Sequence, residues 1–124
     1  MSTKFGGYTG KILKIDLSTK DVSEYPWTDA ERELYIGGKI MAAKIIGDNV
    51  GADVDPLSPE NMMAITTGPF TGCGAPSSAR FNISTKSPLT GILTSSNCGG
   101  GFGLHLKKSG FDALLIVGKA DKPT

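Results

Sequence analysis

Residues 80–103, RFNISTKSPLTGILTSSNCGGGFG, contain the clearest structural pattern in this chain of 124 residues. From Arg80 to Lys86 apolar and polar residues alternate, which is typical of a β-strand. Residues 87–91 supply a proline and a glycine for a turn, and residues 92–96 return as a second strand. The glycines at 99–101 then open a helix. This stretch predicts a β-hairpin followed directly by a short helix.

The sequence on both sides extends the same kind of fold. A partly alternating strand places Leu13, Ile15 and Leu17 on one face, and Thr28 with Glu31 forms a capping box that starts a helix at Asp29. Gly110 is expected to end the helix after the triple glycine. Further elements are predicted as strands at 11–17, 22–25, 62–67 and 113–117, a helix at 39–47, and loops at 53–61 and 71–79. The predicted fold class is α+β: β-rich, mainly antiparallel hairpins, with two or three short helices.

Composition narrows the class of protein. Hydrophobic residues make up 39% and charged residues 20% of the chain, which fits one globular domain. The net charge of +1 argues against a dedicated nucleic-acid-binding protein. No apolar run approaches the roughly 20 residues that span a membrane, and the first residues have no apolar signal core, so we expect a cytoplasmic protein. Cys73 and Cys98 match no metal-binding spacing and are expected to be reduced thiols.

Glycine is over-represented, with 17 residues in clusters. The loop at 99–103 leaves backbone N–H groups free to bind an oxyanion, and a glycine lets a ligand approach the backbone closely. The loop has no Gly-Lys-Ser/Thr ending and therefore is not a Walker loop. The alternative is a strand-to-helix connection that only needs positive φ angles, and the loop by itself leaves both interpretations open.

Five cationic or titratable residues need an interpretation. Arg80 follows a run of small residues, so its guanidinium can reach a phosphate or a flat heterocycle, or it can simply be a solvated strand end. We predict that Lys86 is exposed beside a plain hairpin turn and that Lys107 and Lys108 form a solvated helix end. His105 is expected to be packed or solvated rather than catalytic.

Several segments, in this order, resemble the aldehyde ferredoxin oxidoreductase family. Residues 7–19, from Gly7-Tyr8-Thr9-Gly10 onward, look like the opening hairpin of that family. Further matching segments follow at 55–61, 67–72, 85–91, 97–103 and 110–113. Each segment is unspecific by itself, whereas their ordered combination is specific. The resemblance covers nearly the whole chain.

The resemblance implies that residues 1–124 are an incomplete N-terminal domain, part of a duplicated cofactor-base domain. In the family this domain seats tungstopterin, a tungsten or molybdenum ion held by two pterin dithiolenes, with magnesium bridging the pterin phosphates. A [4Fe-4S] cluster, whose ligands lie outside this chain, passes electrons to ferredoxin while a small aldehyde is oxidised to a carboxylic acid. The implied partners are the remainder of the enzyme or a companion subunit, and ferredoxin. Neither nucleic acid nor a membrane is expected as a partner.

The resemblance also assigns site residues by position. Arg80 looks like the arginine between pterin and cluster, and Asn97 like the residue whose backbone carbonyl helps to hold magnesium. Cys98, Gly99 and Gly100 are expected to lie against the cofactor, with Cys98 not counted as a cluster ligand. No catalytic residue is expected here, so the isolated chain is expected to be inactive. Two alternatives stay open: a stand-alone binding or structural module without metal, and a small phosphate- or nucleotide-binding protein that uses residues 99–103.

Overall fold

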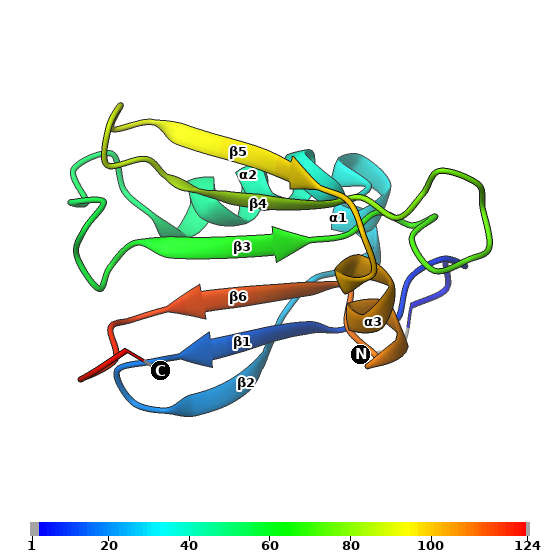
Figure 1. Ribbon diagram of the computed structural model, residues 1–124, viewed down its shortest axis with the longest axis horizontal. Helices are drawn as coiled ribbons and strands as arrows, with labels where there is room; N and C mark the ends of the chain where they lie inside the picture. Colours follow the sequence, from blue (N-terminus) through cyan, green and yellow to red (C-terminus); the bar gives the residue numbers. More distant parts are fainter. Residues whose placement is uncertain (1–2, 124) are drawn as a thin grey trace.

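The structure, a computed structural model, describes residues 3–123 as a mixed β-sheet with three helices (Figure 1). The elements in chain order are β1 (Ile12–Asp16), β2 (Asp21–Tyr25), α1 (Asp29–Tyr35), α2 (Gly38–Asn49), β3 (Met62–Thr66), β4 (Phe81–Lys86), β5 (Leu93–Cys98), α3 (Phe102–Lys108) and β6 (Ala113–Val117). The α+β class predicted from the sequence is confirmed. The capping box at Thr28 and Glu31 is present, and α1 begins at Asp29 as expected.

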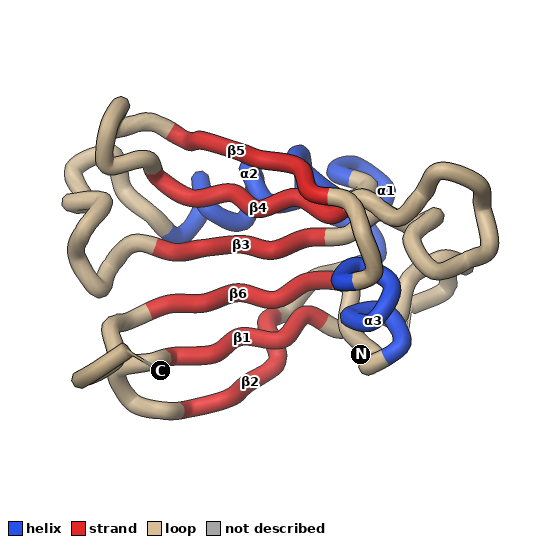
Figure 2. The backbone as a smooth tube through the Cα atoms, viewed as in Figure 1, coloured by secondary structure: helices blue, strands red, loops and turns tan. Residues whose placement is uncertain are grey.

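The sheet has six strands in the order β2-β1-β6-β3-β4-β5 (Figure 2). The hairpins β1–β2 and β4–β5 are both antiparallel, as the turn residues between them predict. The last strand, β6, inserts between β1 and β3, parallel to β1 and antiparallel to β3. Strand β6 therefore joins the two hairpin-containing halves into one sheet.

One face of the sheet is covered by α2, and the main core lies between them (Figure 1). Every second residue of each strand points to this face, because strand side chains alternate. The strands contribute Ile12, Met62, Ala64, Ala113 and Leu115, and the helix contributes Met41, Ala42, Ile45 and Ile46.

The opposite face is also apolar, but within residues 3–123 no helix runs along it over β1, β6 and β3 (Figure 1). Leu13 and Ile15, predicted to share a face, do so and point to this open side, while Ile12 is the β1 residue in the core. The strand register places the following side chains beside them: Met63, Ile65, Ile83, Leu114 and Ile116. Residues 119–122 lie along one end of this face, next to Ile15, Leu17 and Ile116.

Strand β4 turns its polar side chains toward the covered face. Asn82, Ser84 and Lys86 are buried, whereas Ile83 and Thr85 point to the open side. The prediction of an exposed Lys86 is wrong: its ammonium donates hydrogen bonds to the carbonyl oxygens of Gly51, Ala52 and Val54 at 3.3, 2.8 and 2.6 Å. The loop after α2 supplies these acceptors, and they make burial of the charge tolerable.

The prediction of a solvated helix end is wrong for Lys107. Its ammonium is buried, forms an ion pair with Asp112 at 2.7 Å and donates to the carbonyl of Gly7 at 2.6 Å. Asp112 in turn accepts hydrogen bonds from the backbone N–H groups of Thr9 and Gly10, at 2.9 Å each. Lys107 therefore fastens the N-terminal segment to α3, whereas Lys108 is exposed as expected.

The remaining differences are small. Strand β5 continues to Cys98, two residues beyond its predicted end at Ser96, and α3 begins at Phe102. Gly110 follows Ser109, the C-cap of α3, and has a φ of +92°, the conformation expected of a glycine at a helix end. His105 is exposed. Among residues 3–123, every helix is too short or too polar to cross a bilayer.

Candidate cofactor-binding site

An open pocket of about 360 Å³ lies at the end of the sheet where β4 begins and β5 ends. Its walls come from four places: the link between α1 and α2, the end of β3 with the following turn, the loop at 75–78, and the ends of β4 and β5. Two of the site residues implied by the resemblance, Arg80 and Asn97, line this pocket together. They are 17 residues apart in sequence and are brought together by the β4–β5 hairpin.

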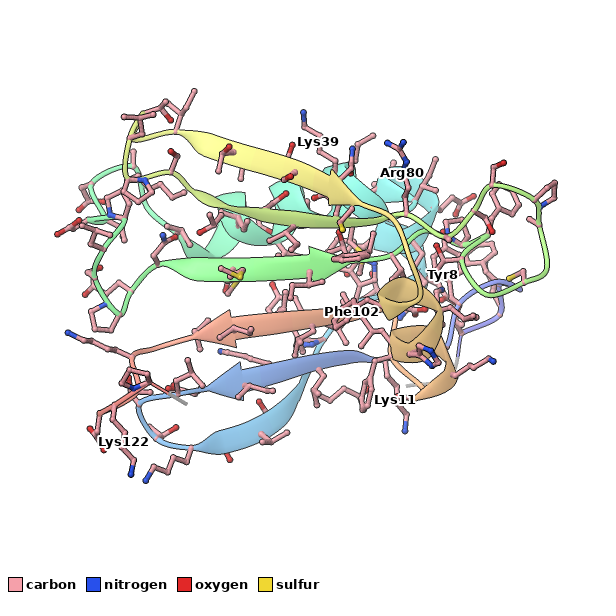
Figure 3. The ribbon with its side chains drawn as sticks, in the orientation of Figure 1. Tyr8, Lys11, Lys39, Arg80, Phe102 and Lys122 are labelled. Atoms are coloured by element: carbon pink, nitrogen blue, oxygen red, sulfur yellow. The ribbon has the colours of Figure 1, made fainter. Side chains whose placement is uncertain are left out.

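Arg80 directly precedes β4 and its side chain is exposed. Figure 3 shows it reaching outward from the ribbon at this end of the sheet. Within residues 3–123 its guanidinium has no protein partner, either as a hydrogen bond or as an ion pair. An arginine presents five N–H donors in a planar fork, so Arg80 offers an unused site for an anion or a ring with paired acceptors.

Asn97 presents its backbone to solvent at the edge of the sheet. The N–H of Ser87 donates to the carbonyl of Ile92, so these two opposite residues form a hydrogen-bonded pair. In an antiparallel hairpin such pairs alternate with pairs that are not hydrogen-bonded to each other. The pair Asn82–Asn97 falls between those bonded pairs, and β5 is the outermost strand. The backbone carbonyl of Asn97 is therefore directed outward, away from β4. Its position fits a hard cation such as magnesium, which takes oxygen ligands.

The pocket loop is held in shape by its own polar groups. The hydroxyl of Thr71, a buried residue, donates to the carbonyl of Ser78 at 3.0 Å, and the hydroxyl of Ser78 donates to the carbonyl of Ala75 at 2.7 Å. Gly37 must be a glycine, because a Cβ there would lie 2.7 Å from the carbonyl oxygen of Thr67. These contacts fix the path of the backbone around the pocket.

Two strained backbone positions also line the pocket, and sequence reasoning missed both. Ile36 and Ser77 have φ angles of 52° and 57°, in the left-handed region that favours glycine. A β-branched residue is a genuine outlier there. The hydroxyl of Tyr8 donates to the carbonyl of Ile36 at 2.7 Å and helps to hold that conformation. Such strain is commonly found at binding sites, and no residue pattern in the sequence indicates it.

The glycine loop lies beside this pocket and does not form its wall. A Cβ built on Gly99 or Gly100 meets no protein atom within 4 Å. Gly100 has a φ of +92° and needs to be glycine for its backbone alone, whereas Gly99 lies outside that region. The described chain therefore gives no internal reason for glycine at 99, and the open space beside it leaves room for a ligand to approach the backbone.

Cys98 faces the other way. It pairs with Phe81 in the register, so its side chain lies on the sheet face opposite to that of Asn97. Its thiol and that of Cys73 are free and exposed. Among residues 3–123, no three His, Cys, Asp or Glu side chains gather where they could hold a metal ion.

Comparisons with known proteins identify the family of the chain. The sequence profile described as "Aldehyde ferredoxin oxidoreductase, N-terminal domain" matches residues 12–124. This chain belongs to that family. A tungsten-containing aldehyde ferredoxin oxidoreductase of Pyrococcus furiosus is 41% identical over 117 residues, covering 94% of this chain and 19% of that protein. The chain thus spans about one fifth of the length of this relative.

Other members of the family differ in the reaction that their names describe. The "aliphatic sulfonate oxidoreductase, WOR-like subunit" of P. furiosus is 34% identical over 119 residues, which are 94% of this chain and 19% of that protein. Among solved structures, the "active site complex BamBC of Benzoyl Coenzyme A reductase" superimposes with a TM-score of 0.91 at 33% identity, covering 94% of this chain and 18% of that chain. Proteins with this fold therefore carry names that describe different substrates, and the family alone does not name the substrate.

Proposed function

We propose that this chain forms part of the seat for a tungsten-pterin cofactor in an oxidoreductase that converts aldehydes to carboxylic acids, with ferredoxin as electron acceptor. The observation that carries the proposal is Arg80, an exposed guanidinium without a protein partner in residues 3–123, in the same pocket as Asn97. Relatives whose names state that they contain tungsten support the choice of metal, and molybdenum is the alternative metal. When bound, the cofactor supplies the two-electron redox chemistry.

The chain's own residues bind and orient that group. Arg80 donates charge-assisted hydrogen bonds to acceptors of the pterin or its phosphates. The outward backbone carbonyl of Asn97 would supply one oxygen ligand to a magnesium ion bound with the cofactor. The open space at Gly99 and Gly100 lets the flat ring system approach the backbone, with Cys98 beside them. A [4Fe-4S] cluster with ligands outside this chain would supply the path for electrons to ferredoxin, and we propose a location in the cytoplasm.

The partner implied by the fold is the remainder of the enzyme, as further polypeptide or as a companion subunit. The open sheet face, with Leu13, Ile15, Ile65, Leu114 and Ile116, is a contiguous apolar surface of the kind that marks a protein contact. Residues 120–122 line an open pocket together with Ile15 and Leu17 at one end of it. Relatives carry more than four fifths of their length outside the region that this chain matches, which supplies enough polypeptide to cover the face.

Metal content of the purified holoprotein tests the proposal. The wild type should contain tungsten or molybdenum when measured by inductively coupled plasma mass spectrometry. Arg80→Ala should lower the metal per polypeptide about tenfold, because losing a charge-assisted hydrogen bond costs roughly 1.5–3 kcal/mol. Lys11→Ala is the matched control, since Lys11 is an exposed cation near the start of β1 and should leave the metal content unchanged (Figure 3).

A second variant separates close approach from charge. Gly99→Val places branches in the space beside the pocket and should reduce metal content without unfolding the chain. Gly6→Val is its control, because Gly6 is exposed and equally free of neighbours within 4 Å. Wild-type protein free of both metals would contradict the proposed function and favour the alternative, a metal-free module of the same fold.

A further inference from the structure

The amide of Asn82 has one possible orientation. Its Nδ2 atom lies 3.2 Å from the carbonyl oxygen of Ser96, which can only accept a hydrogen bond, so the atom facing it must be the donating nitrogen. Its Oδ1 atom accepts a hydrogen bond of 2.6 Å from the hydroxyl of Ser84. Asn82 is 2% exposed and Ser84 is 0% exposed, so water does not compete for these groups.

The orientation of Asn82 determines that of Asn97. The same Nδ2 donates to Oδ1 of Asn97 at 3.0 Å, across the β4–β5 pair. Because Asn97 must offer its oxygen to Asn82, its own Nδ2 is turned away, and within residues 3–123 that nitrogen has no hydrogen-bond acceptor. Asn97 is exposed and lines the pocket, so its free NH₂ group stands at the pocket surface.

The pocket surface is therefore rich in donors at this point. Arg80 contributes an unpartnered guanidinium and Asn97 contributes two amide hydrogens, whereas the amide oxygen of Asn97 is already used by Asn82. Such a surface favours an acceptor-rich, anionic edge of a ligand over a donor-rich one.

We propose that Asn82, anchored by Ser84, is a positioning residue that sets the polarity of this pocket, and that Asn97 uses its side-chain NH₂ as a donor to the anionic or acceptor-bearing edge of the bound ligand. The identity of that ligand as the pterin cofactor rests on the proposed function. The hydrogen-bond relay from Ser84 through Asn82 to Asn97 is a property of the chain and can be tested without the cofactor.

Three variants test the relay. Asn82→Asp keeps the shape of the side chain but, when ionised, can only accept, so the amide of Asn97 should rotate and turn its oxygen toward the pocket. Ser84→Ala removes the anchor and leaves the amide of Asn82 less firmly held. Ser95→Ala is the matched control, because Ser95 lies directly opposite Ser84 in the register and no side-chain hydrogen bond to it is seen within residues 3–123.

The first measurement is nuclear magnetic resonance of protein labelled with ¹⁵N-asparagine. Because burial raises the pKa of an aspartate carboxyl, it is made at a pH at which infrared absorption shows that the introduced carboxyl is ionised. In the wild type the side-chain amide hydrogens of Asn82 should exchange slowly and those of Asn97 quickly. Asn82→Asp should slow the exchange of the Asn97 amide, and Ser84→Ala should speed that of Asn82 about threefold or more. An Asn97 amide that is unchanged in Asn82→Asp overturns the relay, whatever ligand the pocket takes.

The second measurement is the rate at which the holoprotein loses its metal and pterin during dialysis. Asn82→Asp should speed the loss about tenfold and Ser84→Ala about threefold, with Ser95→Ala equal to the wild type. A wild type that binds the cofactor while Asn82→Asp retains it equally well overturns the donor role of Asn97 but leaves the proposed function standing. A wild type without cofactor would contradict the proposed function. The amide exchange measurement would still show whether the hydrogen-bond relay exists.

Discussion

The two ends of β4 carry two cations in opposite situations. At the end of the strand, Lys86 is 7% exposed and its ammonium donates to the carbonyls of Gly51, Ala52 and Val54. At its start, Arg80 is exposed and within residues 3–123 its guanidinium donates to nothing. A cation whose donors are satisfied by the chain stabilises the fold, whereas an unsatisfied one is available for a ligand. The first kind should therefore matter for stability and the second for binding.

Lys107 is also a cation whose donors are satisfied by the chain, and replacing it should have the largest effect on stability. Lys107→Met leaves the carboxylate of Asp112 buried without its partner, and breaking a buried ion pair in this way costs about 3–5 kcal/mol. The free energy of unfolding, measured with urea, should fall by that amount. Lys108→Met is the control, since the neighbouring lysine is exposed. A loss below about 1 kcal/mol would place Lys107 with the surface lysines.

Lys86→Met should come next. The variant keeps much of the apolar length but leaves the three loop carbonyls without their donor, and we expect a loss of about 2 kcal/mol in the free energy of unfolding. Amide hydrogen exchange should also quicken at residues 51–54, since Lys86 ties that loop to the sheet. Lys39→Met, on the exposed side of α2, serves as the control. Equal stabilities of Lys86→Met and Lys39→Met would show that a buried lysine contributes no more to stability than an exposed one.

Arg80→Ala should change the free energy of unfolding by less than about 0.5 kcal/mol, the usual range for surface positions. The reason is that the chain within residues 3–123 makes no use of the guanidinium. A stability loss comparable to that of Lys86→Met would show that Arg80 has a structural partner and would weaken its assignment to the cofactor.

The smallest effect concerns Asp29, a partly enclosed anion. Its pKa is held below the usual range chiefly by the hydroxyl of Thr3, then by the backbone N–H of Lys4 and by Arg32. Because the folded state lowers this pKa, the stabilisation is present above the unfolded value of about 3.9 and is lost as the pH falls through the folded value. Asp29→Asn should therefore reduce the acid sensitivity of the urea midpoint below about pH 4. An unchanged pH profile would contradict this role.

Individual helices and strands could be predicted from residues close together in the sequence. The capping box at Thr28 and the strand at 113–117 appear where the sequence predicts them, because turn residues, caps and alternation act over a few positions. The resemblance predicts Arg80 and Asn97 as cofactor-binding residues, and the hairpin explains why they share a pocket. The sequence did not indicate the positioning role that we propose for Asn82, because a polar residue in an alternating strand is expected to point to solvent.

By itself, the sequence determined the elements, the α+β class and the family, since all three depend on residue types at short spacings. Only the tertiary structure decided that β6 lies between β1 and β3 and that α2 covers the polar side of β4. It also decided which cations are enclosed: the acceptors of Lys86 lie 32 to 35 residues away and the Gly7 carbonyl lies 100 residues from Lys107. The physical reason is that a buried charge is stabilised by partners from distant segments, and no local pattern in the sequence specifies where those segments meet.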